Sequence, residues 1–237
     1  MKVVILCGGK GTRLREETEH RPKALVMVGD RPILWHIMKL YSHYGFNDFV
    51  LCLGYKGEMI KNYFLNYDEF THDFTLQLGS GKKEIHHYDN NTPHWNITFA
   101  DTGLETGTEH RLAAIKPYIG NDEHFFLTYG DGVANVDINN LKRYHTEHGK
   151  LMTVTGVKLP NPFGVLEIEG NEVKTFAEKP VSRDWTNGGF FVCSSKIFDY
   201  LSSDPASSLE LKAFPRLSHA GNVAVYRHDD FGIVWTQ

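Results

Sequence analysis

Short apolar runs alternate with amphipathic segments through the first two thirds of this 237-residue chain. Continuous apolar runs bounded by turn residues are typical of buried strands, and apolar residues at helical spacing are typical of helices that cover a sheet. The segments predicted as strands are Val3–Leu6, Asp48–Leu53, Asn96–Ala100, His124–Tyr129 and Leu151–Val157. The segments predicted as helices are Pro32–Tyr44, Glu58–Phe64 and the stretch from the N-cap Asp137 to Gly149. This order predicts an α/β fold with a Rossmann-like, mostly parallel sheet flanked by helices.

Two parts of the chain depart from this alternation. The polar stretch 68–93 predicts an irregular insertion or a small hairpin. Beyond Pro160, short runs predict a smaller mixed, locally antiparallel region packed on the main sheet; they are Val165–Ile168, Val173–Phe176 and Gly189–Val192. Because no repeat or linker separates the parts, we expect a single domain over residues 1–237, with an internal division near residue 157.

Composition and charge exclude several classes of function. The net charge is −4 with no lysine-rich run, which argues against a nucleic-acid polymer as ligand. No apolar run approaches the ~18 residues of a membrane span, and the apolar start is too short for a signal peptide. We therefore expect a cytoplasmic protein with no membrane partner.

Cysteine and histidine spacing gives little sign of a metal or disulfide framework. Cys7, Cys52 and Cys193 lie far apart in strand-like runs, which predicts reduced, partly buried thiols. His145 and His148 are three apart on a predicted helix and are able to share a face, but their spacing matches no zinc pattern.

The most specific local signal is the glycine-rich loop that follows the first predicted strand. Gly8, Gly9 and Gly11 present bare backbone amides at the carboxyl end of that strand, where a phosphate can approach them. Arg13 and Lys23 add fixed positive charge close by in the sequence. The loop therefore predicts a polyphosphate site.

Two further groups of polar residues have the composition of ligand sites. Asp131, between two glycines at the end of a predicted strand, is suited to hold magnesium, although a tight turn explains the same residues. Glu178 and Asn187 are suited to bind sugar hydroxyls, and Lys179 to neutralise a second phosphate. The alternative for Glu178 and Lys179 is a solvated surface pair.

Taken in order, these motifs resemble the sugar-phosphate nucleotidyltransferases, also called nucleotide-sugar pyrophosphorylases. The resemblance covers nearly the whole chain and is strongest with the branch that transfers CMP from CTP to glucose 1-phosphate. The motifs that carry it are Gly8–Leu14, Pro22–Leu25, Pro32–Met38, Gly54–Gly57, Trp95–Thr98, Asp101–Gly103, Tyr129–Ala134, Phe163–Gly164, Glu178–Pro180 and Asn187–Phe190.

The resemblance implies a reaction in which a sugar-1-phosphate oxygen attacks the α-phosphorus of a nucleoside triphosphate and pyrophosphate leaves. It implies Mg²⁺ as cofactor, CTP and a sugar phosphate as partners, and a homo-oligomer. It also implies nucleotide binding mainly by residues 1–157 and sugar-phosphate binding mainly by 158–237.

The resemblance assigns roles to individual residues as well. The catalytic residues it implies are Arg13, Lys23, Asp131 and Lys179. The nucleotide-binding residues it implies are Leu6, Gly8, Gly9, Gly11, Thr12, Arg13, Lys23, Gly103 and Arg111. The residues it implies for the sugar phosphate are Arg111, Tyr129, Glu178, Lys179, Asn187 and Gly188. Asp131 and Asp230 are the implied metal ligands.

Two departures from the family pattern leave other functions open. Glu109 and His110 stand where the branch has two glycines, and a carboxylate near a triphosphate is repulsive unless it points away or binds a cation. Thr236 takes the position of the second metal-binding aspartate, which leaves Asp229 or Asp230 to replace it. The alternatives are the same chemistry with another nucleotide or a non-glucose acceptor, and a non-catalytic nucleotide-binding regulator.

Overall fold

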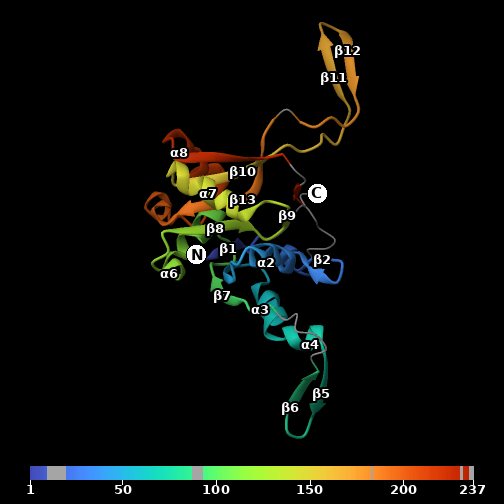
Figure 1. The fold of residues 1–237 in the computed structure, drawn as a ribbon, viewed down its shortest axis with the longest axis vertical. Helices are drawn as coiled ribbons and strands as arrows, with labels where there is room; N and C mark the ends of the chain where they lie inside the picture. The colour runs from blue at the N-terminus through green and yellow to red at the C-terminus, as the bar shows by residue number, and fades with distance from the viewer. Residues whose placement is uncertain (10–19, 87–92, 183, 230–231, 235–237) are drawn as a thin grey trace.

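The computed structural model describes residues 1–9, 20–86, 93–182, 184–229 and 232–234. Its centre is a seven-stranded sheet with the strand order β14-β10-β13-β8-β1-β4-β7. Helices cover both faces of this sheet, and two long hairpins extend from opposite ends of the molecule (Figure 1). The strands of the sheet are β1 (Val3–Leu6), β4 (Asp48–Leu53), β7 (Asn96–Asp101), β8 (His124–Tyr129), β10 (Met152–Val157), β13 (Thr186–Ser194) and β14 (Val223–His228).

The sheet is mostly parallel, as predicted. The strands β8, β1, β4 and β7 run parallel to one another, and β10 pairs in parallel with β14. Only β13 is antiparallel to its neighbours β8 and β10. The carboxyl ends of β1 and β8 therefore meet at one edge, with Leu6 opposite Tyr129, and this edge carries the candidate site.

The helices begin and end where local sequence signals place them. Helix α7 starts after Asp137, whose side chain accepts a hydrogen bond from the Asn140 amide, and it ends at Gly149 in the left-handed conformation. The α-helices are α2 (Ile33–His43), α3 (Gly57–Leu65), α4 (Tyr67–Thr71), α5 (Thr108–Ala114), α6 (Lys116–Ile119), α7 (Ile138–His148) and α8 (Phe214–His219). Shorter helical turns are η1 (Lys23–Leu25), η2 (Ser195–Tyr200) and the π-helical turn η3 (Leu209–Ala213).

The described residues also form four small two-stranded sheets. They are β2 (Met27–Val28) with β3 (Arg31–Pro32), β5 (Asp73–Gln77) with β6 (Lys82–His86), β9 (Gly132–Ala134) with β15 (Gly232–Val234), and β11 (Val165–Glu169) with β12 (Glu172–Ala177). The hairpin β5–β6 confirms the insertion predicted for 68–93.

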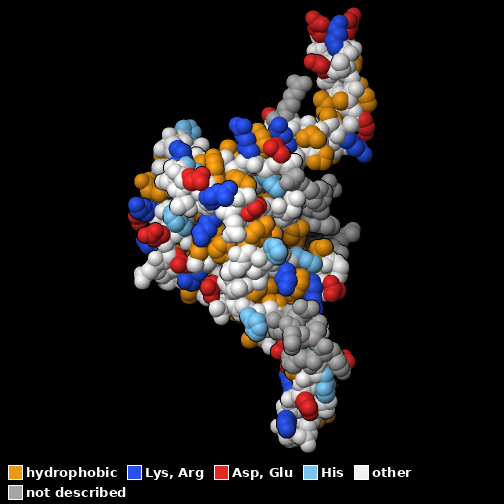
Figure 2. Space-filling model, viewed as in Figure 1, with side chains coloured by type: hydrophobic (Ala, Val, Ile, Leu, Met, Phe, Trp, Pro, Cys, Tyr) orange, Lys and Arg blue, Asp and Glu red, His pale blue; other side chains and the backbone are white. Residues whose placement is uncertain are grey.

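The region beyond Pro160 differs from the prediction of a small antiparallel subregion packed on the sheet. Strand β13 lies inside the main sheet, whereas β11 and β12 form an arm in which every residue is exposed. Hydrophobic side chains lie along this arm in the space-filling view (Figure 2). The sequence pattern was right about the strands but did not show that both faces of the pair stay in contact with solvent.

The core consists of two apolar clusters, and these pack on opposite faces of the sheet because the side chains of each strand alternate between faces. Cys7, Cys52 and Cys193 are buried free thiols, as predicted. Among the helices of the described residues, none combines the length and the apolar character needed to cross a membrane.

Candidate active site

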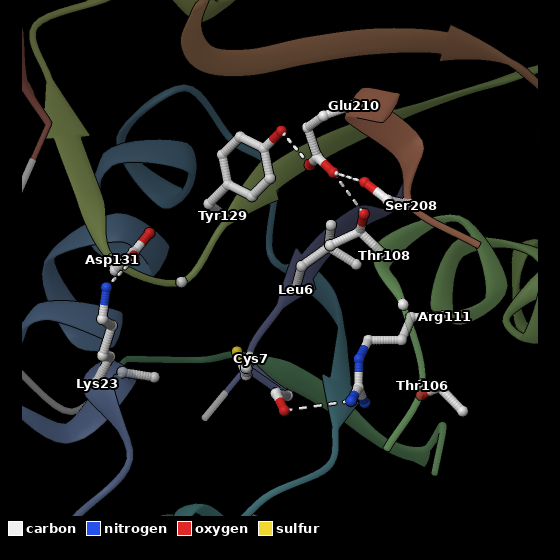
Figure 3. A pocket seen from close by; sticks show the side chains of 15 residues that line it. Leu6, Cys7, Lys23, Thr106, Thr108, Arg111, Tyr129, Asp131, Ser208 and Glu210 are labelled. Carbon is white, nitrogen blue, oxygen red and sulfur yellow. Dashed lines mark hydrogen bonds and ion pairs between the residues drawn. The ribbon is translucent and has the colours of Figure 1, made fainter. Parts of the chain in front are cut away.

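The candidate active site is a pocket of about 340 Å³ at the carboxyl ends of β1 and β8, a size that suits a small-molecule ligand. Five segments of the described residues line it: the start of the glycine loop, η1, the start of helix α5, the end of β8 with the turn after it, and the start of η3 (Figure 3). The residues that line it are Leu6, Cys7, Gly8, Gly9, Lys23, Ala24, Thr106, Gly107, Thr108, Arg111, Tyr129, Gly130, Asp131, Ser208 and Glu210.

One side of the pocket holds an ion pair between Lys23 and Asp131. The ammonium of Lys23, in η1, lies 3.2 Å from Oδ2 of Asp131, which follows β8. Both side chains are partly exposed, at 18% and 29%. A ligand in the pocket can therefore contact both a cation and a carboxylate without any rearrangement of the buried core.

Arg111 packs flat between two glycines and binds backbone carbonyls. Its guanidinium is 3% exposed and donates hydrogen bonds to the carbonyl oxygens of Leu53 and Gly8 and to the hydroxyl of Thr102. A Cβ at Gly8 or Gly54 would lie 2.1 or 2.5 Å from Nη1, so a larger residue at either position would displace the guanidinium. In this structure Arg111 holds the start of the glycine loop in place through its hydrogen bond to the Gly8 carbonyl.

The opposite side of the pocket is built around Glu210 in η3. Its Oε1 accepts from the Tyr129 hydroxyl, and its Oε2 accepts from the hydroxyls of Thr108 and Ser208, each at 2.7 Å. Burial raises the pKa of Glu210, but these hydrogen bonds outweigh burial and hold the pKa below its ordinary value. Burial and the neighbouring carboxylate raise the pKa of Tyr129, so its hydroxyl keeps the proton that it donates.

Glu109 points away from the pocket and is fully buried against the segment 202–216. Its carboxylate accepts hydrogen bonds from the Ser202 amide, the Ser207 hydroxyl and the Arg216 guanidinium. Burial raises its pKa, but these three donors prevail and lower the pKa below its ordinary value. The repulsion considered for Glu109 is thus avoided by both routes, since the side chain turns away and binds a cation.

A close backbone contact joins α5 to the same segment. The Gly107 amide donates to the Pro205 carbonyl at 2.7 Å, and a Cβ at Gly107 would lie 2.1 Å from the Ser207 carbonyl oxygen. Helix α5 therefore bridges the glycine loop, through Arg111, and the segment that carries Glu210.

The structure brings together part of the set predicted from the sequence. The predicted residues that line the pocket are Leu6, Gly8, Gly9, Lys23, Arg111, Tyr129 and Asp131. Asn187 lies next to the pocket, where its side-chain amide donates to the Tyr129 hydroxyl at 3.4 Å, and Gly188 is buried beside it.

Other predicted residues lie elsewhere. Glu178 and Lys179 follow β12, are exposed, and are not among the lining residues. Gly103, in the turn after β7, has φ +94° and also lies outside the lining. Gly11, Thr12, Arg13 and Asp230 fall outside the described residues.

The carboxyl-terminal segment returns to the Asp131 turn, because β15 pairs with β9 and sets Val234 opposite Gly132. Asp229 is exposed at the end of β14. Within the described residues no group of three or more His, Cys, Asp or Glu side chains is arranged to hold a metal ion. Of the two predicted metal ligands, Asp131 lines the pocket and Asp230 lies outside the described residues.

Sequence reasoning missed Glu210, Ser208 and Thr108. Ser208 caps η3 and gives a weak local signal for a helical turn. No local pattern indicates that Glu210 meets Tyr129, which lies 81 residues earlier in the chain.

Comparisons with known proteins show what this chain is similar to in sequence. A family model described as "Nucleotidyl transferase" matches residues 2–236. A probable glucose-1-phosphate cytidylyltransferase of Bacillus subtilis (strain 168) is 48% identical over 236 residues, which is 100% of this chain and 90% of that protein. A glucose-1-phosphate cytidylyltransferase of Salmonella typhi is 43% identical over 232 residues, covering 98% of this chain and 89% of that protein.

Two solved structures share the fold. HddC from Yersinia pseudotuberculosis has a TM-score of 0.71 at 22% identity, covering 98% of this chain and 92% of that chain. A putative glucose-1-phosphate thymidylyltransferase from Bacillus anthracis has a TM-score of 0.69 at 20% identity, covering 98% and 88%. The predicted α/β architecture is confirmed.

Proposed function

Because this chain belongs to the nucleotidyl transferase family, we propose that it transfers CMP from CTP to glucose 1-phosphate and releases pyrophosphate. The observation that carries the proposal is the pocket in which the glycine-loop backbone, Lys23 and Asp131 meet. Full-length similarity to two glucose-1-phosphate cytidylyltransferases supports the choice of both substrates.

The chemistry needs alignment and charge neutralisation more than a reactive side chain. A phosphate oxygen of the sugar phosphate forms a bond to the α-phosphorus of CTP, and the bond from that phosphorus to the bridging oxygen breaks. In this scheme the amides of Gly8 and Gly9 receive phosphate oxygens, and Lys23 neutralises charge near the α-phosphate. Arg111 keeps the loop in place by binding the Gly8 carbonyl.

We propose Mg²⁺ as the cofactor, held by Asp131. A single carboxylate plus substrate phosphates is a common way for proteins to bind this ion. The donor set fits, because Asp131 lines the pocket and, among the described residues, its side chain makes its polar contact through Oδ2 to Lys23. When bound, the ion would neutralise phosphate charge and help to orient the two anions.

The remaining assignments are proposals at other positions. Glu178, Lys179, Asn187 and Gly188 are proposed for the sugar phosphate, with Lys179 on its phosphate. For the nucleotide we propose Leu6, Gly11, Thr12, Arg13 and Gly103, and Asp230 as a second metal ligand. Residues 1–157 and 158–237 are proposed as the nucleotide and sugar-phosphate parts of a cytoplasmic homo-oligomer.

The test is pyrophosphate release measured over a matrix of the four ribonucleoside triphosphates and a panel of sugar 1-phosphates, with magnesium. We expect CTP with glucose 1-phosphate to be the best pair and Asp131→Ala to abolish turnover. Asp199→Ala is the matched control, since its side chain is 73% exposed and pairs only with Lys116, at 3.5 Å among the described residues. The proposal would be overturned if none of the substrate pairs gave pyrophosphate release, or if the protein bound nucleotide without turnover.

A further inference from the structure

The two sides of the pocket have opposite hydrogen-bonding character. Lys23 and the glycine-loop amides offer donors. On the Glu210 side, the hydroxyls of Thr108, Ser208 and Tyr129 each have one proton, and each gives it to the Glu210 carboxylate (Figure 3). A hydroxyl that has donated its proton offers only lone pairs. This side therefore presents acceptors to a ligand.

The Glu210 carboxylate keeps room for a further donor. Two carboxylate oxygens provide about four acceptor positions, and the three hydroxyls occupy three of these, two on Oε2 and one on Oε1. The backbone amide of Glu210 itself makes the smallest contribution of the four donors that lower the pKa of this carboxyl. No basic side chain of the described residues forms an ion pair with Glu210, so its negative charge faces the pocket without a cation.

The carboxylate is also held rigidly. Thr108 donates to Oε2 and accepts a hydrogen bond from the Leu209 amide at 2.8 Å. On the other side of α5, Glu109 accepts hydrogen bonds from the Ser202 amide and the Arg216 guanidinium and so holds the segment 202–216 that contains Glu210. A rigid acceptor loses little conformational entropy when a ligand binds, so it discriminates strongly between ligands that supply a donor and ligands that do not.

The position of Glu210 points to the sugar rather than to the base. Its partner Tyr129 also accepts from Asn187, at the start of β13 and close to the segment proposed for the sugar phosphate. Gly103, which is proposed for the nucleotide, instead follows Thr102, whose hydroxyl accepts a hydrogen bond from Arg111.

We propose that Glu210 is a specificity-determining residue of this site, whose carboxylate accepts a hydrogen bond from a hydroxyl of the sugar phosphate and repels sugars that carry an anionic substituent there. The inference rests on the proposed function and extends it to the class of acceptor: a neutral, polyhydroxylated sugar phosphate.

The test compares the wild-type enzyme with Glu210→Gln, which keeps the size and removes the charge. We expect kcat/KM for glucose 1-phosphate to fall ~10- to 100-fold, with the KM for CTP unchanged, because the lost hydrogen bond is to a charged acceptor. The ratio of kcat/KM for glucose 1-phosphate to kcat/KM for glucuronic acid 1-phosphate should also be smaller in the variant than in the wild type. Glu147→Gln, an exposed glutamate on α7, is the matched control, and melting temperatures of all variants verify folding.

A binding measurement separates this inference from the proposed function. By titration calorimetry, Glu210→Gln should bind CDP-glucose more weakly by the same factor while binding CDP as the wild type does. If CDP and CDP-glucose weaken equally, or the KM for CTP rises alone, Glu210 faces the nucleotide and the inference fails. If the variant binds both like the wild type, it also fails. A wild-type protein that binds no CDP-glucose would instead refute the proposed function, and this inference with it.

Discussion

Replacing Glu109 by alanine should remove the buried contact that fixes segment 202–216 to helix α5. The carboxylate is 0% exposed and takes donors from three places in that segment: the Ser202 amide, the Ser207 hydroxyl and the Arg216 guanidinium. The variant leaves the buried Ser207 hydroxyl and the half-buried Ser202 amide without their acceptor. Arg216 can return to water, since its side chain is 46% exposed.

The size of the effect follows from these exposures. A buried donor without a partner costs about 1–3 kcal/mol, so the Ser202 amide and the Ser207 hydroxyl together cost about 4 kcal/mol. Arg216 adds little because solvent receives its charge. The free energy of unfolding should therefore fall by about 4 kcal/mol, and the melting temperature of a chain of this length by about 10 °C.

Urea unfolding at pH 7, followed by circular dichroism, measures this loss. The matched control is Glu147→Ala, whose carboxylate lies 3.9 Å from Arg143 with both side chains about 70% exposed, and it should change stability by less than about 0.5 kcal/mol. The reasoning is refuted if the two variants lose the same amount. Glu109→Gln should lower the free energy of unfolding by less than Glu109→Ala does, since the amide oxygen of glutamine still accepts hydrogen bonds.

Three other results are expected. Gly8→Ala should lower the melting temperature, because its Cβ would lie 2.1 Å from the guanidinium of Arg111. Gly9→Ala should not, since no atom of the described residues lies within 4 Å of the added Cβ, and equal melting temperatures for the two variants would contradict this contact. Lys23→Ala should reduce kcat/KM for CTP at least 100-fold in the pyrophosphate assay with little change in melting temperature, and a small effect would exclude Lys23 from the phosphate site. Burial lowers the pKa of His145 to about 4, so between about pH 6.5 and pH 4 the unfolded chain binds a proton at this residue and the folded protein does not. The free energy of unfolding should therefore fall by about 2 kcal/mol as the pH is lowered from 7 to 5, as measured by urea titrations. The same slope in His145→Gln would show that another group is responsible.

The sequence predicted those parts of the fold that local patterning determines. The predicted strands Val3–Leu6, Asp48–Leu53 and His124–Tyr129 coincide with β1, β4 and β8. The middle of each strand is buried on both faces and appears as an apolar run, Val3–Leu6 in β1, Phe49–Leu53 in β4 and Phe125–Leu127 in β8. The glycine loop and the aspartate after β8 then reach one edge because parallel strands end together.

The parts that the sequence did not predict depend on partners distant in the chain. Glu109 resembled a repulsive charge beside a triphosphate, because its direction is decided by Arg216 and Ser207, about 100 residues later. Glu210 gave no sign of a site, because its position is decided by Tyr129 and Thr108. Alternating patterns likewise predicted β11 and β12 as strands, but packing against the sheet is a tertiary property that such patterns do not contain.

The contact between Gly107 and Ser207 also determines when, during synthesis, the chain can complete its ligand pocket. The strands β1, β4, β7 and β8 and helix α5 leave the ribosome before residues 202–216 do, so a nascent chain can form half of its central sheet and its glycine loop while one wall of the pocket is still missing. Ligands that need Glu210 cannot then stabilise these early intermediates. Nucleotide sugar added to ribosome-bound chains should protect them from proteolysis only after this last segment has emerged.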